Sequence, residues 1–589
     1  MKLMSSKVLE IRDLSIAFQT DESYVHAVNS ISFDVLEGEI CALVGESGSG
    51  KSVTAQAIMG LVGRKQNEIV TGSIKFSEAG KSIDILKLRD EEIRDIRGRK
   101  ISMVFQEPMT SLHPMYKIGD QLREAIQVHS NLAGDEINKL IYEALDQVMI
   151  PNPKEIINDY PHSLSGGMRQ RVMIAMAILF RPKILIADEP TTALDVTIQS
   201  QILSLILKLV DEINLSVIFI THDMSVVSEI ADQVLVLKSG DLVERKTVAE
   251  IFNQPEEEYT KNLIKSVPVF GNYSQSEKLV HENQKDSCLL EVKNVSKTFL
   301  KKKGFFSKSL KENKALQNVS LEIRAGQTLS IVGESGSGKT TLARCVTKLI
   351  SSDDGEINFN GKNLNRISKK ELNLMRREIQ FIFQDPYASL NPRMPVNYLV
   401  TEPLHIHGEI RKKENTEHAS RLLNEVKLDD SYLNRYPHEL SGGQRQRICI
   451  ARALALKPKL IVADEPLSAL DVTIQSQIID LLLELQLKFQ LSFLVISHDL
   501  AVVEKISHHV GVMCKGRLVE FGKTNEVLYD PRHNYTKLLL NSIPTINRNR
   551  KTKTIKEVNL LDTDYSKKFE FLKNSTYINV SKDHFYLTG

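Results

Sequence analysis

The sequence GESGSGKS at Gly45–Ser52 returns almost unchanged as GESGSGKT at Gly333–Thr340. Each copy follows an apolar run of strand length, such as ICALVG at Ile40–Gly45, and precedes a stretch of helical character. In that strand–loop–helix context, GxxxxGK[S/T] predicts a phosphate-binding loop. Its glycines let backbone N–H groups turn towards phosphate oxygens, and the start of the following helix adds partial positive charge. The alternative is a chance glycine-rich turn, and the second copy argues against it.

The two loops belong to a longer pattern that is written twice in the chain. The other repeated segments are MVFQEPMTSLHP (Met103–Pro114) with IFQDPYASLNP (Ile382–Pro392), YPHSLSGGMRQRVMIAMAI (Tyr160–Ile178) with YPHELSGGQRQRICIARAL (Tyr436–Leu454), and ILIADEPTTALDVTIQSQI (Ile184–Ile202) with LIVADEPLSALDVTIQSQI (Leu460–Ile478). A repeat of about 250 residues is far longer than the 20–50 residues of a solenoid unit. The pattern therefore predicts two copies of one complete domain.

Polar stretches between and after the copies set the domain boundaries. We predict a first domain over residues 1–268, a linker over 269–289, a second domain over 290–545 and a polar C-terminal tail over 546–589. The linker is placed on Phe270–Ser287, a polar run without apolar periodicity. Since the tail is polar and begins with several basic residues, we expect it to be poorly ordered.

Composition limits the class of protein. The chain has 589 residues, a net charge of +2 and 42% hydrophobic residues, which is ordinary for a soluble globular protein and too balanced for a nucleic-acid binder. Its five cysteines are scattered without a CxxC pair, which predicts no cysteine-ligated metal centre or iron–sulfur cluster. No stretch reaches the ~18–20 apolar residues of a membrane helix, and the first residues lack the apolar core of a signal peptide. We expect a cytosolic protein that reaches a membrane only through partners.

Two acidic pairs stand at the ends of apolar strands. The run ILIADE ends in Asp188 and Glu189, and LIVADE ends in Asp464 and Glu465. Sheets of α/β proteins bind ligands at the carboxyl ends of their strands. The aspartates suit Mg²⁺, directly or through water, and the glutamates suit general-base work on an attacking water. A helix-capping role is the alternative for these acids.

A histidine follows a further apolar strand in each copy. His222 lies 34 residues after Asp188, and His498 lies 34 residues after Asp464. A lone histidine in such a place is usually structural. The equal spacing in both copies favours a sensor of a terminal phosphate instead.

The segments LSGGM (Leu164–Met168) and LSGGQ (Leu440–Gln444) resemble the signature motif of ATP-binding-cassette ATPases. A phosphate loop followed by LSGGQ, ADEP, ALD and a histidine is similar to this superfamily alone, and the match covers about nine-tenths of the chain. The resemblance implies an α/β fold with two tandem P-loop NTPase domains. Each would have a RecA-like core, an antiparallel β subdomain and a helical subdomain.

In that superfamily two cassettes pair head to tail, so that each ATP lies between one phosphate loop and the other signature. The resemblance implies that site one is formed by Gly45, Ser47, Gly48, Gly50, Lys51, Ser52, Gln106, Asp188, Glu189 and His222 with Ser441, Gly442, Gly443 and Asp471. Site two is formed by Gly333, Ser335, Gly336, Gly338, Lys339, Thr340, Gln384, Asp464, Glu465 and His498 with Ser165, Gly166, Gly167 and Asp195.

Within these sites the resemblance assigns roles. The catalytic residues are Glu189, Glu465, His222, His498, Gln106 and Gln384. The Mg²⁺ ligands are Ser52, Thr340, Gln106, Gln384, Asp188 and Asp464. Phe18 and Phe299 would stack on adenine, with a plain core aromatic as the alternative. Because Met168 leaves the signature serine and glycines intact, we expect both sites to turn over ATP.

Details of the motifs are similar to the peptide-importer branch of this superfamily. After each core comes an extension, Gln254–Lys261 and Asp530–Lys537, that resembles the Pro…Tyr-Thr tail element of oligopeptide-type importers. The whole chain is most similar to fused ATPases of bacterial glutathione importers, with fused microcin or peptide ATPases next.

This resemblance implies an ATP-hydrolysing, Mg²⁺-dependent subunit that couples to solute translocation. Its partners would be two membrane permeases and a periplasmic binding protein, with no nucleic acid and no obligatory homodimer. It would sit peripherally on the cytoplasmic face of the inner membrane, and the permeases would contact Glu107–Leu164 and Asp385–Leu440.

Several alternatives stay open at this point. Importers of dipeptides, oligopeptides, microcin-like peptides, nickel or sugars share much of this pattern, and the binding protein and permeases select the solute. A ribosome-associated tandem cassette would have a long, charged helical linker, which Phe270–Ser287 does not resemble. A DNA-repair cassette would need cysteine zinc modules, which the five scattered cysteines do not provide.

Overall fold

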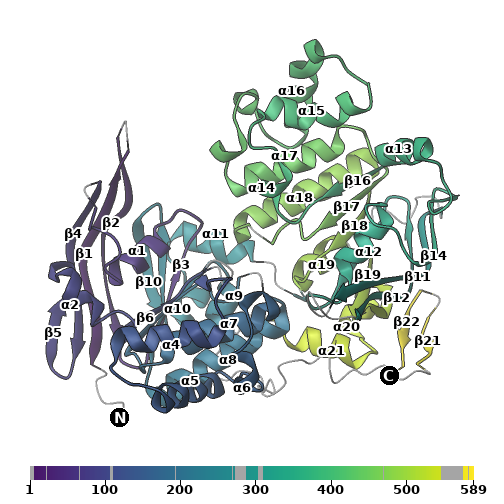
Figure 1. The fold of residues 1–589 in the computed structure, drawn as a ribbon. Helices are drawn as coiled ribbons and strands as arrows, with labels where there is room; N and C mark the ends of the chain where they lie inside the picture. The colour runs from purple at the N-terminus through teal and green to yellow at the C-terminus, as the bar shows by residue number, and fades with distance from the viewer. Residues whose placement is uncertain are drawn as a thin grey trace.

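The computed structural model describes residues 6–20, 23–65, 67–106, 111–192, 194–267, 270–271, 287–302, 310–468, 470–544, 575–581 and 583–588. They form two halves of similar architecture that lie side by side, the first purple to teal and the second teal to yellow in Figure 1. Each half has an antiparallel sheet, a mostly parallel core sheet and a helical subdomain.

The core sheet of the first half has the strand order β10-β9-β3-β8-β7-β6. Its strands are β3 (Ile40–Val44), β6 (Ile101–Val104), β7 (Ile184–Asp188), β8 (Ser216–Thr221), β9 (Gln233–Lys238) and β10 (Asp241–Thr247). Neighbours pair in parallel except β9 with β10. The central strands β3, β7 and β8 are buried throughout and mostly apolar because both faces are covered, as is usual for parallel sheets.

The two faces of this sheet belong to different hydrophobic cores. On β3, Ile40, Ala42 and Val44 pack into the core that holds the helices, whereas Cys41 and Leu43 pack into the core beneath the antiparallel sheet. This alternation follows from the period of two along a strand.

The remaining elements of the first half cover these faces. The antiparallel sheet has the order β2-β1-β4-β5, with β1 (Lys7–Gln19), β2 (Tyr24–Leu36), β4 (Glu68–Glu78) and β5 (Lys81–Asp84). The helices are α1 (Lys51–Ile58), α2 (Asp90–Arg94), α4 (Ile118–His129), α5 (Asp135–Gln147), α6 (Pro153–Ile156), α7 (Gly166–Ile178), α8 (Val196–Ile213), α9 (Met224–Ile230), α10 (Val248–Asn253) and α11 (Glu258–Ser266).

The second half repeats this plan. Its strands are β11 (Cys288–Lys302), β12 (Leu310–Arg324), β13 (Thr328–Val332), β14 (Asp354–Phe359), β15 (Lys362–Asn363), β16 (Ile379–Ile382), β17 (Leu460–Asp464), β18 (Ser492–Ile496), β19 (His509–Cys514) and β20 (Arg517–Lys523). Its helices are α12 (Lys339–Val346), α13 (Lys369–Glu378), α14 (Pro386–Ser389), α15 (Val396–Ile406), α16 (Asn415–Glu425), α17 (Gly442–Leu454), α18 (Val472–Phe489), α19 (Leu500–Ile506), α20 (Thr524–Tyr529) and α21 (Asn534–Asn541).

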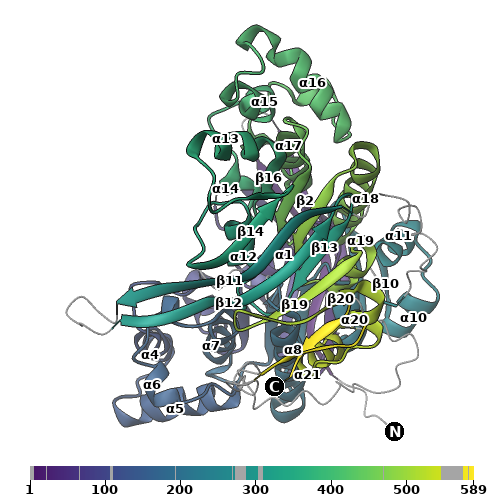
Figure 2. The same ribbon diagram turned by 90° about the vertical axis from the view of Figure 1, so that its right-hand side faces the viewer.

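The end of the chain departs from the sequence expectation. The tail was predicted to be poorly ordered, but β21 (Tyr577–Asn579) and β22 (Phe585–Leu587) form a hairpin that extends the second core sheet beyond β20. The hairpin is yellow in Figure 2. Leu587 is buried in a hydrophobic cluster of the second half. This apolar contact helps to hold the segment in place, although the composition of the tail is polar. Residues 545–574 lie outside the described part of the tail.

Two pairs of helices bring the halves together. Helix α11 lies against α18, and α21 lies against α8. Val472, at the start of α18, belongs to the hydrophobic core of the first half. Most of the predicted linker, 269–289, falls outside the described residues, and β11 begins at Cys288. In the described part of the chain, no helix is both long and apolar enough to span a membrane.

Candidate active site

The phosphate loops connect β3 to α1 and β13 to α12. Gly50 and Gly338 precede these helices with φ values of 98° and 107°. A side chain on Gly50 would place its Cβ 2.4 Å from the carbonyl oxygen of Ala27, and one on Gly338 would lie 2.3 Å from that of Ala315. Glycine is therefore required where each loop passes its antiparallel sheet. At Gly48 and Gly336 the space is open, which leaves backbone accessible to a ligand.

The loop lysines are buried and point back into their loops. The Lys51 ammonium donates to the carbonyl oxygens of Gly45 and Glu46, each at 2.8 Å. Lys339 donates in the same way to Gly333 at 2.6 Å and Glu334 at 2.9 Å. Burial lowers the pKa of both lysines, against the attraction of nearby carboxylates. A buried cation inside a ring of backbone groups fits an anionic phosphate ligand.

A hydroxyl and a carboxylate meet beside each loop. Ser52 Oγ donates to Asp188 Oδ1 at 3.1 Å, and Thr340 Oγ1 donates to Asp464 Oδ1 at 3.1 Å. Burial raises the pKa of both aspartates, with the hydroxyl hydrogen bonds acting against it. Paired hydroxyl and carboxylate oxygens are a donor set that fits Mg²⁺.

The glutamate after each aspartate is the centre of a polar network. Glu189 accepts from Gln106 Nε2 at 2.8 Å and from Thr192 Oγ1 at 2.9 Å, and its other oxygen lies 3.3 Å from His222 Nδ1. Burial acts to raise the pKa of Glu189, but the hydrogen bonds of His222 and Thr192 and the charges of His222 and Lys51 together lower that pKa to about 2. Burial acts to lower the pKa of His222, and Glu189 raises it overall.

The second half reproduces the glutamine and histidine contacts of this network, while Ser468, which corresponds to Thr192, donates to the backbone oxygen of Glu465. Glu465 accepts from Gln384 Nε2 at 2.7 Å and lies 3.6 Å from His498 Nδ1. Burial opposes the charged form of both groups, but His498 with Lys339 and Gln384 lowers the pKa of Glu465, and Glu465 with Asp499 and Asp195 raises that of His498. Both glutamates have left-handed backbones, with φ of 47° at Glu189 and 46° at Glu465. Such strain in a non-glycine residue is typical of functional sites.

Each phosphate loop is in contact with the opposite half. The N–H of Ser47 donates to Asp471 Oδ2 at 3.1 Å, and the N–H of Ser335 donates to Asp195 Oδ2 at 2.8 Å. Both aspartates immediately precede a long helix, α18 or α8. The first contact joins residues of the predicted site one from different halves, and the second does the same for the predicted site two.

A second pair of contacts across the halves was not foreseen from the sequence. Thr473 Oγ1 donates to Glu46 Oε1, and Thr197 Oγ1 donates to Glu334 Oε1, both at 2.8 Å. The only sequence signal was that GES and DVT occur in both copies, and neither triplet reveals its partner.

The signature residues lie at the starts of α7 and α17. Ser165 and Ser441 cap these helices by accepting from the N–H three residues later, both at 3.3 Å. Gly167 is required because a Cβ there would lie 2.5 Å from Ile198 Cγ2, and Gly443 meets Ile474 in the same way. Ser165, Gly166, Ser441 and Gly442 are exposed. Among the described residues, the hydrogen bonds between a phosphate loop and the opposite half come from the aspartates and threonines above, and not from the signatures.

The two aromatic candidates lie on the antiparallel sheets. Phe18 is partly buried and pairs with Val25, two residues from the Ala27 that touches the first phosphate loop. Phe299 is 41% exposed, and the Lys297 ammonium lies 5.7 Å from the centre of its ring. The exposed face of Phe299 leaves room for stacking, whereas Phe18 also contributes to the core.

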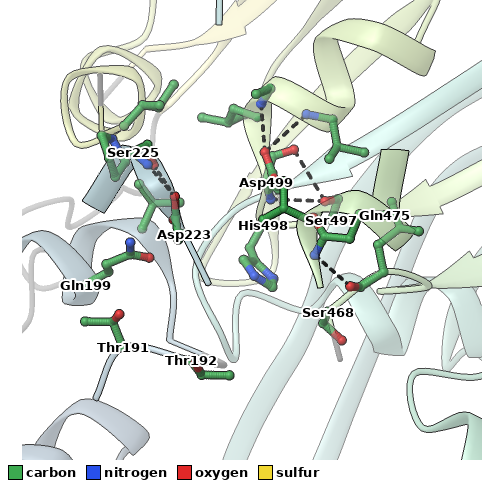
Figure 3. A pocket seen from close by; sticks show the side chains of 18 of the residues that line it. Thr191, Thr192, Gln199, Asp223, Ser225, Ser468, Gln475, Ser497, His498 and Asp499 are labelled. Atoms are coloured by element: carbon green, nitrogen blue, oxygen red, sulfur yellow. Dashed lines mark hydrogen bonds between the residues drawn. The ribbon is translucent and has the colours of Figure 1, made fainter. Parts of the chain in front are cut away.

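A cavity of about 160 Å³ lies between the two halves. Figure 3 shows Asp223 and Ser225 of the first half on one side and His498 and Asp499 of the second half on the other. Burial raises the pKa of Asp499, whose carboxylate accepts from the N–H groups of Ala501 and Val502. The cavity therefore borders the histidine-bearing loops and belongs to the same site.

Comparison with known proteins agrees with this geometry. The family described as ABC transporter matches residues 28–192 and 316–468, and the family described as oligopeptide/dipeptide transporter, C-terminal region, matches residues 243–292 and 519–570. The chain belongs to the ABC transporter family, and within it to the ATP-binding subunits that hydrolyse ATP.

The individual relatives are full-length matches. The chain is 47% identical over 571 residues to the glutathione import ATP-binding protein GsiA of Escherichia coli O157:H7, covering 93% of this chain and 91% of that protein. It is 44% identical over 569 residues to the protein of that name from Pectobacterium atrosepticum, with the same coverage. A solved dimeric ATP-binding cassette, MJ0796 bound to ADP and Pi, is 33% identical with a TM-score of 0.36, covering 40% of this chain and 99% of that one.

Proposed function

We propose that this chain is the energy-coupling ATPase of a bacterial importer for glutathione or short peptides. It would work with two permeases and a periplasmic binding protein at the cytoplasmic face of the inner membrane. The main support is that each phosphate loop pairs with the aspartate of the opposite half, Asp471 or Asp195. One chain therefore supplies both halves of both nucleotide sites.

The roles of the site residues follow from their chemistry. Lys51 and Lys339 would hold the β- and γ-phosphates of ATP, and the exposed signature serines would close on those phosphates from the other half. Mg²⁺ would be held by Ser52 with Asp188 and by Thr340 with Asp464, with Gln106 and Gln384 nearby, and would neutralise charge that develops on the phosphates.

The glutamates would act on the attacking water. A Glu189 carboxylate paired with His222 is ionised at neutral pH but accepts a proton poorly, because its pKa is about 2. When His222 turns to the terminal phosphate instead, Glu189 loses its strongest stabilising partner and becomes a better base. The same reasoning applies to Glu465 with His498.

The helical subdomain of the first half offers a surface for a permease. A hollow of about 840 Å³ lies there, lined in part by Met103, Phe105, Met173 and Met176. Beside it Met115 is 76% exposed. Exposed methionine and aromatic side chains mark sites of protein contact. Other lining residues, from Ser111 to His129, fall within the predicted permease contact 107–164, whereas the four lining residues named above lie outside it. Residues 107–110 lie outside the described part.

Affinity isolation of the tagged chain from gently solubilised native cells tests the importer function. We expect two multi-span permeases to co-purify, and the binding protein that belongs with them to bind glutathione or short peptides. Glutathione is the first solute to test because the relatives are named for its import. Recovery of ribosomes in place of permeases would leave only the ATPase assignment standing.

A further inference from the structure

The extension after each core reaches back to the phosphate loop of its own half. The phenol oxygen of Tyr259, in the first turn of α11, accepts from the N–H of Glu46 at 3.1 Å. The phenol oxygen of Tyr535, in the first turn of α21, accepts from the N–H of Glu334 at 3.0 Å. The same contact occurs twice in the chain, at corresponding positions.

Both tyrosines pack against their surroundings. Tyr535 is fully buried in the second half, and Tyr259 is partly buried, with the Lys238 ammonium 5.1 Å from the centre of its ring. Burial raises the pKa of both phenols, so each is neutral and offers a lone pair to an amide hydrogen.

A buried glutamate on the last core strand anchors each extension. Glu244 on β10 accepts from the N–H groups of Glu256 and Glu257, at 2.9 and 3.3 Å. Glu520 on β20 accepts from those of Arg532 and His533, at 2.7 and 3.0 Å. Because these amides lie just ahead of α11 and α21, the anchors fix the place from which each tyrosine points.

The first extension also contacts helix α18 of the opposite half. Asp471, just before α18, pairs with the same phosphate loop as Tyr259. Helix α11 packs on α18, and Tyr259, Leu263 and Val472 share one hydrophobic core. Residue 471, just before α18, accepts from Ser47 N–H, while Tyr259 accepts from the adjacent Glu46 N–H. Two consecutive amides at the entrance of the phosphate loop are thus fixed, one by the extension and one by the opposite half.

We propose that Tyr259 and Tyr535 are positioning residues for nucleotide binding, each acting through the phosphate loop of its own half. The proposal rests on the nucleotide sites assigned above. Neither tyrosine needs to touch the nucleotide. Each hydrogen bond holds the loop entrance so that the following amides and the lysine face the phosphates, and its loss weakens binding at one site only.

The test is a binding titration of the full chain with one site disabled. In a Lys339→Ala background, the dissociation constant of site one is measured with a non-hydrolysable ATP analogue and Mg²⁺. We expect Tyr259→Phe to weaken binding about five-fold, the effect of losing one hydrogen bond of ~1 kcal/mol. Tyr535→Phe should change it less than two-fold. In a Lys51→Ala background the two results should exchange.

Tyr529→Phe is the matched control, because its phenol donates to Glu504 in the neighbouring helix and not to a phosphate loop. It should leave both dissociation constants unchanged. The proposal is overturned if neither tyrosine variant shifts its own site, or if both sites weaken together while the thermal unfolding temperature falls. Failure of the single-lysine variants to bind any nucleotide would instead refute the nucleotide sites themselves.

Discussion

The two halves place the same kinds of group around the nucleotide sites, several of them at nearly equal distances, and differ more where each half meets other structure. The amide of Gln106 lies 2.8 Å from Glu189, and that of Gln384 lies 2.7 Å from Glu465. The threonine–glutamate contacts across the halves are 2.8 Å in both directions. The chemistry is thus symmetric in the structure. Any difference in behaviour between the sites must come from the supporting residues around them.

One such difference caps the signature helices. Gln444 accepts from Ser441 N–H at 2.9 Å and donates to the Tyr432 phenol at 3.0 Å, which completes a reciprocal cap of α17. In the first half Met168 stands in that position, and α7 has only the bond from Met168 N–H to Ser165. The signature that serves site two therefore lacks a support that the other signature has.

A larger difference lies at the edge of the core sheets. In the first half Lys246 lies 3.3 Å from the buried Glu244. Gly522 stands at the corresponding position of the second half, and the tail supplies His584, whose Nε2 lies 2.9 Å from Glu520. A Cβ on Gly522 would lie 3.1 Å from the His584 ring, so the glycine makes room for the tail. The tail histidine thus lies beside Glu520 as Lys246 lies beside Glu244 in the first half.

The largest expected effect tests the symmetry of the chemistry. Glu189→Gln and Glu465→Gln each keep the shape of the side chain but remove the base, which costs on the order of 10²–10⁴-fold in rate at that site. We expect each single variant to lower steady-state ATP hydrolysis strongly, since both sites hold the same kinds of group around the glutamate. The measurement is phosphate release by the purified chain, with the double variant as the baseline. Wild-type activity in either single variant would mean that its site does not contribute to turnover.

The sequence predicted what depends on short local patterns. Phosphate loops, acidic strand ends and signature helices can each be recognised from about ten consecutive residues, because their function requires fixed residue types at fixed spacing. The tyrosine contacts could not be predicted, because Tyr259 and Glu46 are 213 residues apart and the Pro…Tyr-Thr element does not reveal which group the phenol meets. Thr473 and Glu46 are 427 residues apart. The roles of the predicted site residues stay predictions until the variants are measured.

The tail hairpin escaped prediction for a different physical reason. Each strand of Tyr577–Asn579 and Phe585–Leu587 has only three residues, too few for an alternating pattern to stand out. The hairpin is stable because Phe585 stacks on Phe521 and His584 meets Glu520, both contacts with a distant part of the chain.

The next largest effect is expected from removing residues 575–589. The loss uncovers β20 and takes His584 away from Glu520, so we expect the second half to lose about 1–3 kcal/mol of stability while the first half is unchanged. Calorimetric unfolding of the full and shortened chains should show one transition moving to lower temperature. Identical unfolding of both chains would mean that the hairpin is only a passive addition.

A single substitution sharpens this test. Gly522→Lys in the shortened chain recreates the lysine–glutamate pair of the first half and should recover part of the lost stability. In the full-length chain the same substitution should destabilise, because the new side chain competes with the His584 ring for space. A change of equal sign in both chains would refute the exchange of lysine for histidine.

The smallest expected effect concerns the signature caps. Met168→Gln allows the new side chain to accept from Ser165 N–H, which is worth ~0.5–1 kcal/mol as one neutral hydrogen bond. The gain is limited because Ile156 stands where the second half has Tyr432, so the amide finds no phenol. Gln444→Met should cost more stability, since it removes both hydrogen bonds of the Gln444 side chain.

In the Lys51→Ala background, where only site two binds, Met168→Gln should tighten binding of the ATP analogue about two- to four-fold. In the Lys339→Ala background, Gln444→Met should weaken site one by a larger factor. If the two reciprocal changes had no effect on affinity, the caps would only stabilise their helices. The two sites would then bind ATP equally despite Met168 in one signature and Gln444 in the other.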